Sequence, residues 1–540
     1  MLRTSTVLLL MTLVSLSTGS AMAQEGGSCS SEEATTSFRQ GFRAATERDS
    51  DTAMRHFRAC LDQEPNCIPC LYEIGWTYWT RGSWKSCIAS WEQVLELDPA
   101  HEDAKTYLVS AKDYERNSRS LSSRSTRVPI GTRSKPEEAP IKLTLSSRFQ
   151  NYKSEPKDPE NDHYDKDIYS PKSVRFSADG AKVYVNSLEG YRTVVYDSKT
   201  LEKLSVIDHR FTEENEALFQ GETTVFGYPF FKKPRSGKVN HFRGKPVESE
   251  ISHGGRYLWI PYYRRNYDGG ATSPSAVAIV DTSTDEIVRM MPTGPIPKYV
   301  EASPDGNWVA VTHWGDNTVG LIDTSSGDPK TFKYRDERMV VVKVLSQRGL
   351  AGENRDKACG YCLRGTVFTP DSKTLLVARM SGGGIAGFDV ASGEYLGTVT
   401  GMKPTPRHLV IGPEGKQLFL SSNSSGYVSR IELEAVVTAL REEGDSRVSI
   451  EGWVTAYVGS GARTIGLGPQ GRYIFSAANV NSEVVVIDSG TMNVVGRVRS
   501  DKYTVGLAVS PDGKQVWTTS QGKADKGGGN SVCVFTVEYP

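Results

Sequence analysis

Five basic residues occupy one position of a repeated sequence pattern. The pattern is marked by a turn of the Pro-Asp-Gly type, which returns seven times from residue 171 onward. Eight residues before the last residue of each turn stand Lys172, Val247, Lys298, Arg364, Arg407, Arg463 and Val505. If the repeats surround a common axis, the five cations lie close together, and their mutual repulsion favours the binding of an anion.

Two interpretations of these cations remain open. Each cation could pair with a neighbouring acid or bond to a strand carbonyl, because buried charges are usually paired. Alternatively, the five form a funnel that binds a carboxylate, a phosphate, a polyanion or an acidic partner loop. His408 follows Arg407 directly and would add a titratable donor at the same rim.

Two neighbouring segments could belong to the same binding surface. The stretch Tyr262–Tyr267 places Arg264 and Arg265 between tyrosines, and Trp314 takes the equivalent place in the next repeat. Tyr, Trp and Arg are enriched where proteins recognise their partners. Solvated irregular loops are the alternative interpretation.

Sequence motifs of common enzyme classes are absent. The chain lacks Gly-x-Ser-x-Gly, His-Glu-x-x-His, a phosphate-binding Gly-x-x-x-x-Gly-Lys-Ser/Thr loop and a Rossmann glycine run. The eight histidines are scattered, and none pairs at the spacing of metal ligands. We therefore predict no catalytic residue, no metal site and no cofactor. Because repeats can assemble a site from distant residues, a hydrolase or lyase acting on an anionic small molecule is the alternative function.

The repeats predict an all-β, seven-bladed β-propeller over residues 162–540. Proline presets the turn, and glycine accepts its positive backbone angle. The turns are centred on Asp179, Gly254, Asp305, Asp371, Glu414, Gln470 and Asp512. Seven such units, each of roughly 40 residues or more, are typical of this fold. From about Pro171 to Tyr539 the pattern resembles the YVTN-type (surface-layer-like) propellers of exported bacterial proteins, which implies the fold and leaves the function open.

A second, all-α domain is predicted over residues 28–117. A 34-residue self-similarity sets Gly41 over Gly75, Phe57 over Trp91 and Pro65 over Pro99. This pattern resembles the tetratricopeptide repeat, which implies stacked helical hairpins that grip a protein or peptide.

Residues 118–161 are predicted to be a linker that contains one strand. Ile141–Ser146 alternates apolar and polar residues, as a half-buried strand does. The seventh unit ends without a fourth strand, so this segment is expected to complete the last blade and remove exposed sheet edges. The helical domain would then hang beside blade seven.

Residues 1–23 read as an export signal with an Ala-x-Ala cleavage site, and a retained N-terminal anchor is the alternative. Export makes disulfides plausible. We expect Cys60 to bridge Cys67 or Cys70, and Cys359 to bridge Cys362, rather than redox-active pairs. Each domain holds an odd number of cysteines, so each keeps a free thiol unless a bridge joins the domains.

These features together predict an exported, non-enzymatic binding or scaffold protein. It would reside in the periplasm or outside the cell of a bacterium, with no transmembrane segment in the mature chain. A protein or peptide would bind the helical repeats, and an anionic small molecule or polyanion would bind the propeller mouth. The formal net charge of zero argues against nucleic acid as a partner.

Overall fold

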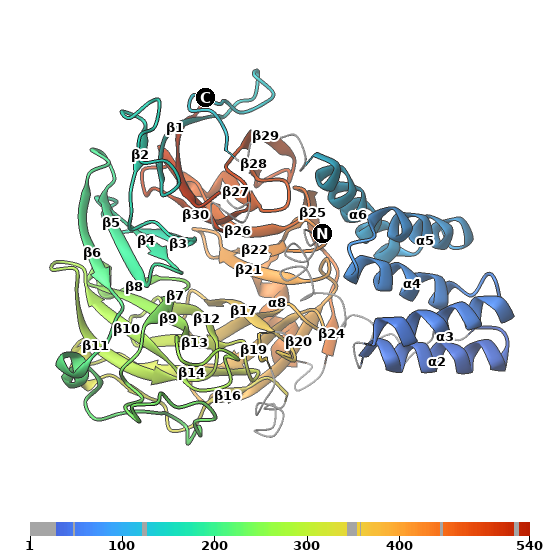
Figure 1. Ribbon diagram of the computed structural model, residues 1–540, viewed down its shortest axis with the longest axis horizontal. Coiled ribbons are helices and arrows are strands. Elements are labelled where there is room, and N and C mark those ends of the chain that lie inside the picture. Colours follow the sequence, from blue (N-terminus) through green and yellow to red (C-terminus); the bar gives the residue numbers. More distant parts are fainter. Residues whose placement is uncertain are drawn as a thin grey trace.

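The computed structural model describes residues 29–46, 49–120, 127–342, 354–356, 358–442, 447–522 and 529–540. The predicted export signal therefore lies outside the described residues. A row of helices precedes a ring of seven β-sheets, in agreement with the predicted fold class (Figure 1). Within the described ranges, no helix is both long and apolar enough to cross a bilayer.

The helical domain owes its packing to the residues that define its repeat. Gly75 lies against the indole of Trp91, and Gly41 lies against the ring of Phe57, so a Cβ at either glycine would overlap the aromatic ring. The small and large positions of the repeat are thus the contact points between paired helices. The helices are α2 (Glu32–Thr46), α3 (Ser50–Gln63), α4 (Ile68–Thr80), α5 (Trp84–Leu97) and α6 (Glu102–Ser120).

Two disulfides lie side by side in this domain, Cys29–Cys67 and Cys60–Cys70, and the third is Cys359–Cys362 in the propeller. The predicted bridge from Cys60 thus ends on Cys70, whereas the partner of Cys67 was missed because Cys29 is far from it in sequence. Cys87 and Cys533 are the free, buried thiols.

Replacing Cys60 and Cys70 by serine should lower the free energy of unfolding of the helical domain by about 2 kcal/mol, because the loop they close regains freedom in the unfolded chain. Thermal unfolding followed by the helical circular dichroism signal measures this loss. The matched control replaces Cys359 and Cys362, which bridge a separation of three residues in the propeller. An equal effect of both pairs on the helical transition would contradict the prediction.

Each sheet of the ring is one blade. Blade one consists of β3 (Pro171–Phe176), β4 (Lys182–Ser187), β5 (Arg192–Asp197) and β6 (Lys203–Asp208). Blade two consists of β7 (Gly244–Pro246), β8 (Glu250–Ser252), β9 (Tyr257–Arg265), β10 (Ser275–Asp281) and β11 (Glu286–Thr293). Blade three consists of β12 (Pro297–Ala302), β13 (Trp308–His313), β14 (Thr318–Asp323), β15 (Lys333–Tyr334) and β16 (Met339–Val340).

The remaining blades follow in chain order. Blade four consists of β17 (Leu363–Phe368), β18 (Thr374–Arg379), β19 (Ile385–Asp389), β20 (Tyr395–Thr400) and β24 (Arg447–Ser449). Blade five consists of β21 (Pro406–Ile411), β22 (Gln417–Ser422), β23 (Tyr427–Glu432) and β25 (Val454–Tyr457), with helix α8 (Leu433–Glu442) after β23. Blade six consists of β26 (Ala462–Leu467), β27 (Tyr473–Ala478), β28 (Glu483–Asp488) and β29 (Val494–Arg499).

Blade seven joins the two ends of the propeller chain. It contains β30 (Thr504–Val509), β31 (Gln515–Ser520), β32 (Ser531–Glu538), β1 (Lys142–Gln150) and β2 (Asp162–Tyr164). β1 pairs antiparallel with β32, from Lys142 opposite Glu538 to Gln150 opposite Ser531. A strand from before the first blade therefore supplies the outer part of the last, and the ring has no open seam there.

The helical domain docks elsewhere than the sequence led us to expect. Helix α6 contacts blade five and the loop that leads into blade six. In blade five, the Oγ of Ser110 donates a hydrogen bond to the carbonyl of Ser425, between β22 and β23, at 3.2 Å. Asp113 accepts a hydrogen bond from the hydroxyl of Tyr457, and Ser460 bonds to the carbonyl of Ser110. These hydrogen bonds are made to blade five and to the loop that leads into blade six, whereas the sequence led us to expect the helical domain beside blade seven.

Candidate ligand-binding channel

The first strands of the blades line the central channel. Neighbouring first strands, such as β12 and β17 or β26 and β30, contact one another around the axis. All run in the same direction, from the loops between blades toward the Pro-Asp-Gly turns. The position that carries the cations is the second residue of β3, β12, β17, β21 and β26, so all five cations lie at the same end of the channel. We call this end the cationic mouth.

A β-bulge lies at the cation position in six blades. In blade one, Pro171 and Ser173 pair with consecutive residues of β4, so Lys172 is an extra residue with no partner. The pairing skips Lys298 and Arg407 in the same way, and shifts around Arg364 in blade four, Arg463 in blade six and Val505 in blade seven. A bulge bends the strand and redirects a side chain. Because of the bulge, the residue after the cation position, such as Ser173, Tyr299 or His408, also lies in the wall of the channel.

Two of the five cations have an acidic partner. The Nζ of Lys298 lies 2.9 Å from Oδ1 of Asp356, and Nη2 of Arg364 lies 3.6 Å from Oε1 of Glu248. Burial lowers the pKa of Lys298 to about 8 and that of Arg364 to about 10, in spite of these partners. Asp356 lies in the connection between blades three and four, whereas Glu248 lies between β7 and β8 of blade two, directly after Val247 at the cation position. Neither acid was predicted from the sequence.

The other three cations have no carboxylate within ion-pair distance among the described residues. Nη1 of Arg407 instead contacts the sulfur of Met380 at 3.4 Å, and Arg463 lies over the ring of Tyr503. Burial, and then repulsion from neighbouring cations, hold the pKa values of Lys172 and Arg407 well below their usual ranges. The mouth thus carries more positive charge than its own carboxylates balance.

Aromatic rings border the mouth on the side of blades two and three. The Nζ of Lys298 lies 4.2 Å from the centre of Tyr263 and 5.2 Å from that of Trp314. Trp314, which the sequence singled out, also lies 5.9 Å from the guanidinium of Arg364. Tyr263 belongs to the stretch noted from the sequence but was not chosen as a site residue.

Arg264 and Arg265 have other contacts. Arg265 is 1% exposed, and its guanidinium donates to the carbonyls of Val239 and Ser275 in blade two. Arg264 donates to the carbonyl of Gly269. Both residues belong to strand β9, and the groups that they contact are not those of the cationic mouth. The sequence had led us to expect them in a loop of the binding surface.

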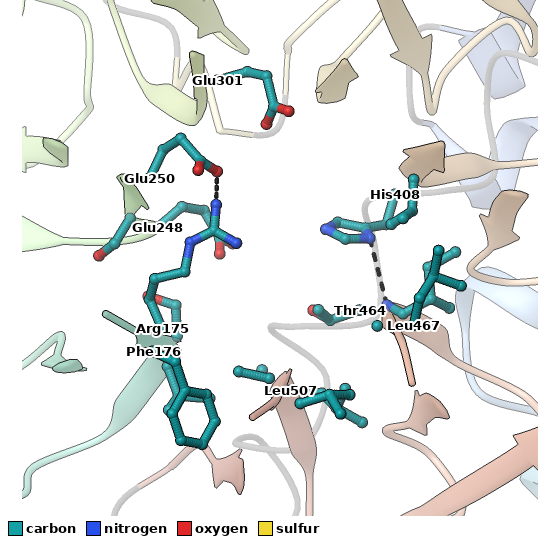
Figure 2. A pocket seen from close by; sticks show the side chains of 18 of the residues that line it. Arg175, Phe176, Glu248, Glu250, Glu301, His408, Thr464, Leu467 and Leu507 are labelled. Atoms are coloured by element: carbon teal, nitrogen blue, oxygen red, sulfur yellow. Dashed lines mark hydrogen bonds and ion pairs between the residues drawn. The ribbon is translucent and has the colours of Figure 1, made fainter. Parts of the chain in front are cut away.

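A cavity of about 510 Å³ occupies the part of the channel between the cationic mouth and the turns. It is lined by residues next to the cations, such as Ser173, Tyr299 and His408, and reaches the turn residues Ala178 and Pro511. His408, expected at the mouth, is therefore part of this cavity (Figure 2). Glu248 lines the cavity and also pairs with Arg364, so it connects the cavity to the mouth.

Three charged side chains of the cavity were missed from the sequence. Arg175, Glu250 and Glu301 lie three residues beyond the cation position in blades one, two and three, and Arg175 pairs with Glu250 (Figure 2). The carboxyl of Glu301 has no hydrogen bond or ion pair within the described ranges, and burial raises its pKa to about 8. The bulge at the cation position puts Ser173 and Arg175 on the same face of β3, and because this bulge was not predicted, the set could not be assigned to the channel from the sequence.

His408 is not placed to act as a base at the mouth. Its Nε2 lies 2.9 Å from the hydroxyl of Tyr299, and its Nδ1 accepts a hydrogen bond from the backbone N–H of Ile465 at 3.4 Å. Burial and the nearby Arg407 lower its pKa to about 3. The imidazole is thus neutral and fixed between two partners.

Comparisons with known proteins give limited similarity. No protein-family model matches the chain, so neither family resemblance seen in the sequence gains support from one. A curated nitrite reductase from Stutzerimonas stutzeri is 25% identical over a 211-residue alignment, which covers 33% of this chain and 37% of the relative. The match thus spans little more than a third of the length of that relative.

Two solved structures are similar to most of the chain. Hydrazine synthase from Kuenenia stuttgartiensis aligns with a TM-score of 0.45 and 16% identity, covering 69% of this chain and 97% of that one. The β-propeller domain of Cps50 (Swd1) from Myceliophteria thermophila aligns with a TM-score of 0.47 and 13% identity, covering 68% and 97%. At these values the similarities carry no ligand or activity over to this chain.

Proposed function

We propose that the protein is a binding protein whose cationic mouth takes up an anionic ligand or an acidic segment of a partner. The observation that carries this proposal is the surplus of cations at the mouth, where Lys172, Arg407 and Arg463 have no carboxylate within ion-pair distance among the described residues. Keeping unpaired cations together costs free energy, and a bound anion would recover it.

The helical domain fits the scaffold part of this proposal. Helix α6 docks on mouth-side loops of blades five and six, while α2 to α5 project away from the propeller (Figure 1). A protein or peptide held by these helices would lie next to the mouth, and an acidic segment of it could reach the cations. Export to the periplasm or the cell surface is part of the same proposal, and the three disulfides are compatible with it.

The test is a binding measurement with defined anions. Inorganic phosphate, citrate, nitrite and polyphosphate are titrated into the protein at low ionic strength, and nitrite is included because the partly similar relative is a nitrite reductase. The variant Arg364→Gln, Arg407→Gln, Arg463→Gln should lose about tenfold in affinity for each charge-assisted hydrogen bond removed. It should also unfold at a higher temperature than the parent protein without ligand, because repulsion is removed.

The matched control replaces three exposed arginines, Arg256, Arg447 and Arg499, by glutamine, which changes the net charge equally. Its affinity should stay within a factor of two of the parent protein. If no anion binds, or if the mouth variant binds as tightly as the control, the anion site is wrong. A mouth variant less stable than the parent would indicate that the cations serve the fold instead.

A further inference from the structure

The cavity beyond the mouth has two unlike walls. Blades one to three supply the polar wall, with Arg175, Glu248, Glu250, Tyr299 and Glu301. Blades five to seven face it with mostly apolar groups, among them Leu409, Ile465, Leu467, Leu507 and Val509. Figure 2 shows Arg175 at the left of the open space and His408 and Leu467 at the right, with Glu301 above and Leu507 below. A ligand here would need polar groups on one edge and a carbon-rich face on the other.

The hydrogen bonds of His408 determine which ring nitrogen carries its proton and where the hydroxyl proton of Tyr299 can go. Because Nδ1 of His408 accepts from the backbone of Ile465, the proton of the neutral ring lies on Nε2, which donates to the Tyr299 oxygen. The hydroxyl proton of Tyr299 is then left without an acceptor among the described residues. Burial raises the pKa of Tyr299, so this proton stays on the oxygen at neutral pH.

Glu301 adds a second donor. With its pKa raised to about 8, the carboxyl is protonated at pH 7 and can donate as well as accept. Arg175 has its charge neutralised by Glu250, and its side chain is 36% exposed, so the guanidinium still has donors open to the cavity. The polar wall is therefore close to neutral and presents donors from Tyr299, Glu301 and Arg175 beside the acceptor oxygens of Glu248 and Glu250.

Hydroxyl groups satisfy such a wall, since each both donates and accepts. An anion would face Glu248 and Glu250, and a cation would face Arg175 with the mouth behind it. The volume of about 510 Å³ lies within the range of roughly 300–1,000 Å³ that is usual for small-molecule sites. We infer that this cavity binds a neutral polyhydroxylated molecule, a sugar or polyol, at a subsite separate from the anion site at the mouth.

The experiment uses the mature chain and calorimetric titration at pH 7. The probes are neutral hexoses, hexitols and disaccharides, with glucuronate, glucosamine and cyclohexylmethanol as anionic, cationic and hydroxyl-poor analogues. At least one neutral sugar or polyol should bind, and each analogue should bind at least tenfold more weakly. If no neutral probe binds, or if a charged analogue binds most tightly, the inference is overturned.

Variants locate the binding and separate it from the mouth. Tyr299→Phe removes one donor and should weaken sugar binding about tenfold, whereas Tyr334→Phe removes a hydroxyl on the outer strand β15 and should not change it. Ala508→Phe should block the cavity, which Ala508 lines. Equal affinity in the Tyr299→Phe and Tyr334→Phe variants would refute this location. The variant Arg407→Gln, Arg463→Gln, which leaves the Arg364–Glu248 pair intact, should weaken anion binding but keep sugar binding, so failure of either site is seen independently.

Discussion

Asp501→Ala is expected to lower the free energy of unfolding of the propeller by about 4 kcal/mol, because it leaves a buried guanidinium without its main partner. Asp501 is fully buried, and its Oδ2 lies 3.0 Å from Nε of Arg148 on the closing strand β1. It also accepts from the backbone N–H of Val128 and the hydroxyl of Ser531. The Asp501 carboxylate, which precedes β30, thus connects the segment around Val128 with strands β1 and β32 of blade seven.

Chemical denaturation measures this loss as a shift of the transition midpoint, provided that the dependence of the unfolding free energy on denaturant concentration is the same for both proteins. Glu538→Ala, which removes an exposed acid from β32 of the same blade, is the control and should change stability by less than about 0.5 kcal/mol. In the double variant Arg148→Met, Asp501→Ala the loss should be smaller than in the single variant, because no unpaired charge remains buried. A single variant as stable as the control would show that Asp501 does not secure the closure.

Glu301→Gln is expected to stabilise the protein by about 5 kcal/mol at pH 9 and to leave it almost unchanged near pH 4. Burial raises the pKa of Glu301 to about 8, above its value in the unfolded chain. Below the unfolded pKa the carboxyl is protonated in both states and costs nothing. Between about pH 4.5 and pH 8 the unfolded chain ionises this carboxyl while the folded protein keeps it protonated, so stability falls over this range, and above pH 8 the loss no longer grows.

The charged groups around Glu301 set the size of this effect. Arg175 favours the ionised carboxylate, but Glu250 already pairs with it, and Tyr299 and His408 are neutral. Thermal unfolding from pH 4 to pH 9 should show the two curves separating above about pH 5. Glu250→Gln is the contrasting variant, because it removes the partner of Arg175 and should destabilise the protein at pH 7. Parallel curves for Glu301→Gln and the parent would contradict the raised pKa.

The features that could be read from the sequence depend on local chemistry. The Pro-Asp-Gly turns need a residue that accepts positive φ, and Gly180, Gly306, Gly415 and Gly513 have φ values of 71° to 75°. The paired small and aromatic positions of the helical repeat are direct contacts between neighbouring helices. The alternation over Ile141–Ser146 corresponds to β1, because one face of that strand is buried.

The features that were missed depend on segments distant in sequence. The bridge of Cys29 to Cys67, the docking of α6 on blade five and the pairing of Asp356 with Lys298 all need the chain to be folded first. The β-bulges were missed as well, because an extra residue in one strand is visible only against its partner. Without them, the side of the strand that Arg407 and His408 face could not be assigned.

For the channel as a whole, the repeated pattern was enough to predict that five cations share one position of a recurring strand. That follows because each repeat forms the same strand, running in the same direction around one axis. Which of these cations meet a carboxylate depends on the folded chain, since Asp356 comes from the connection between blades three and four and Glu248 comes from blade two, next to Val247. The tertiary structure also decided that His408 lies in the cavity with Tyr299 and Glu301, because that grouping joins side chains from different blades across the channel.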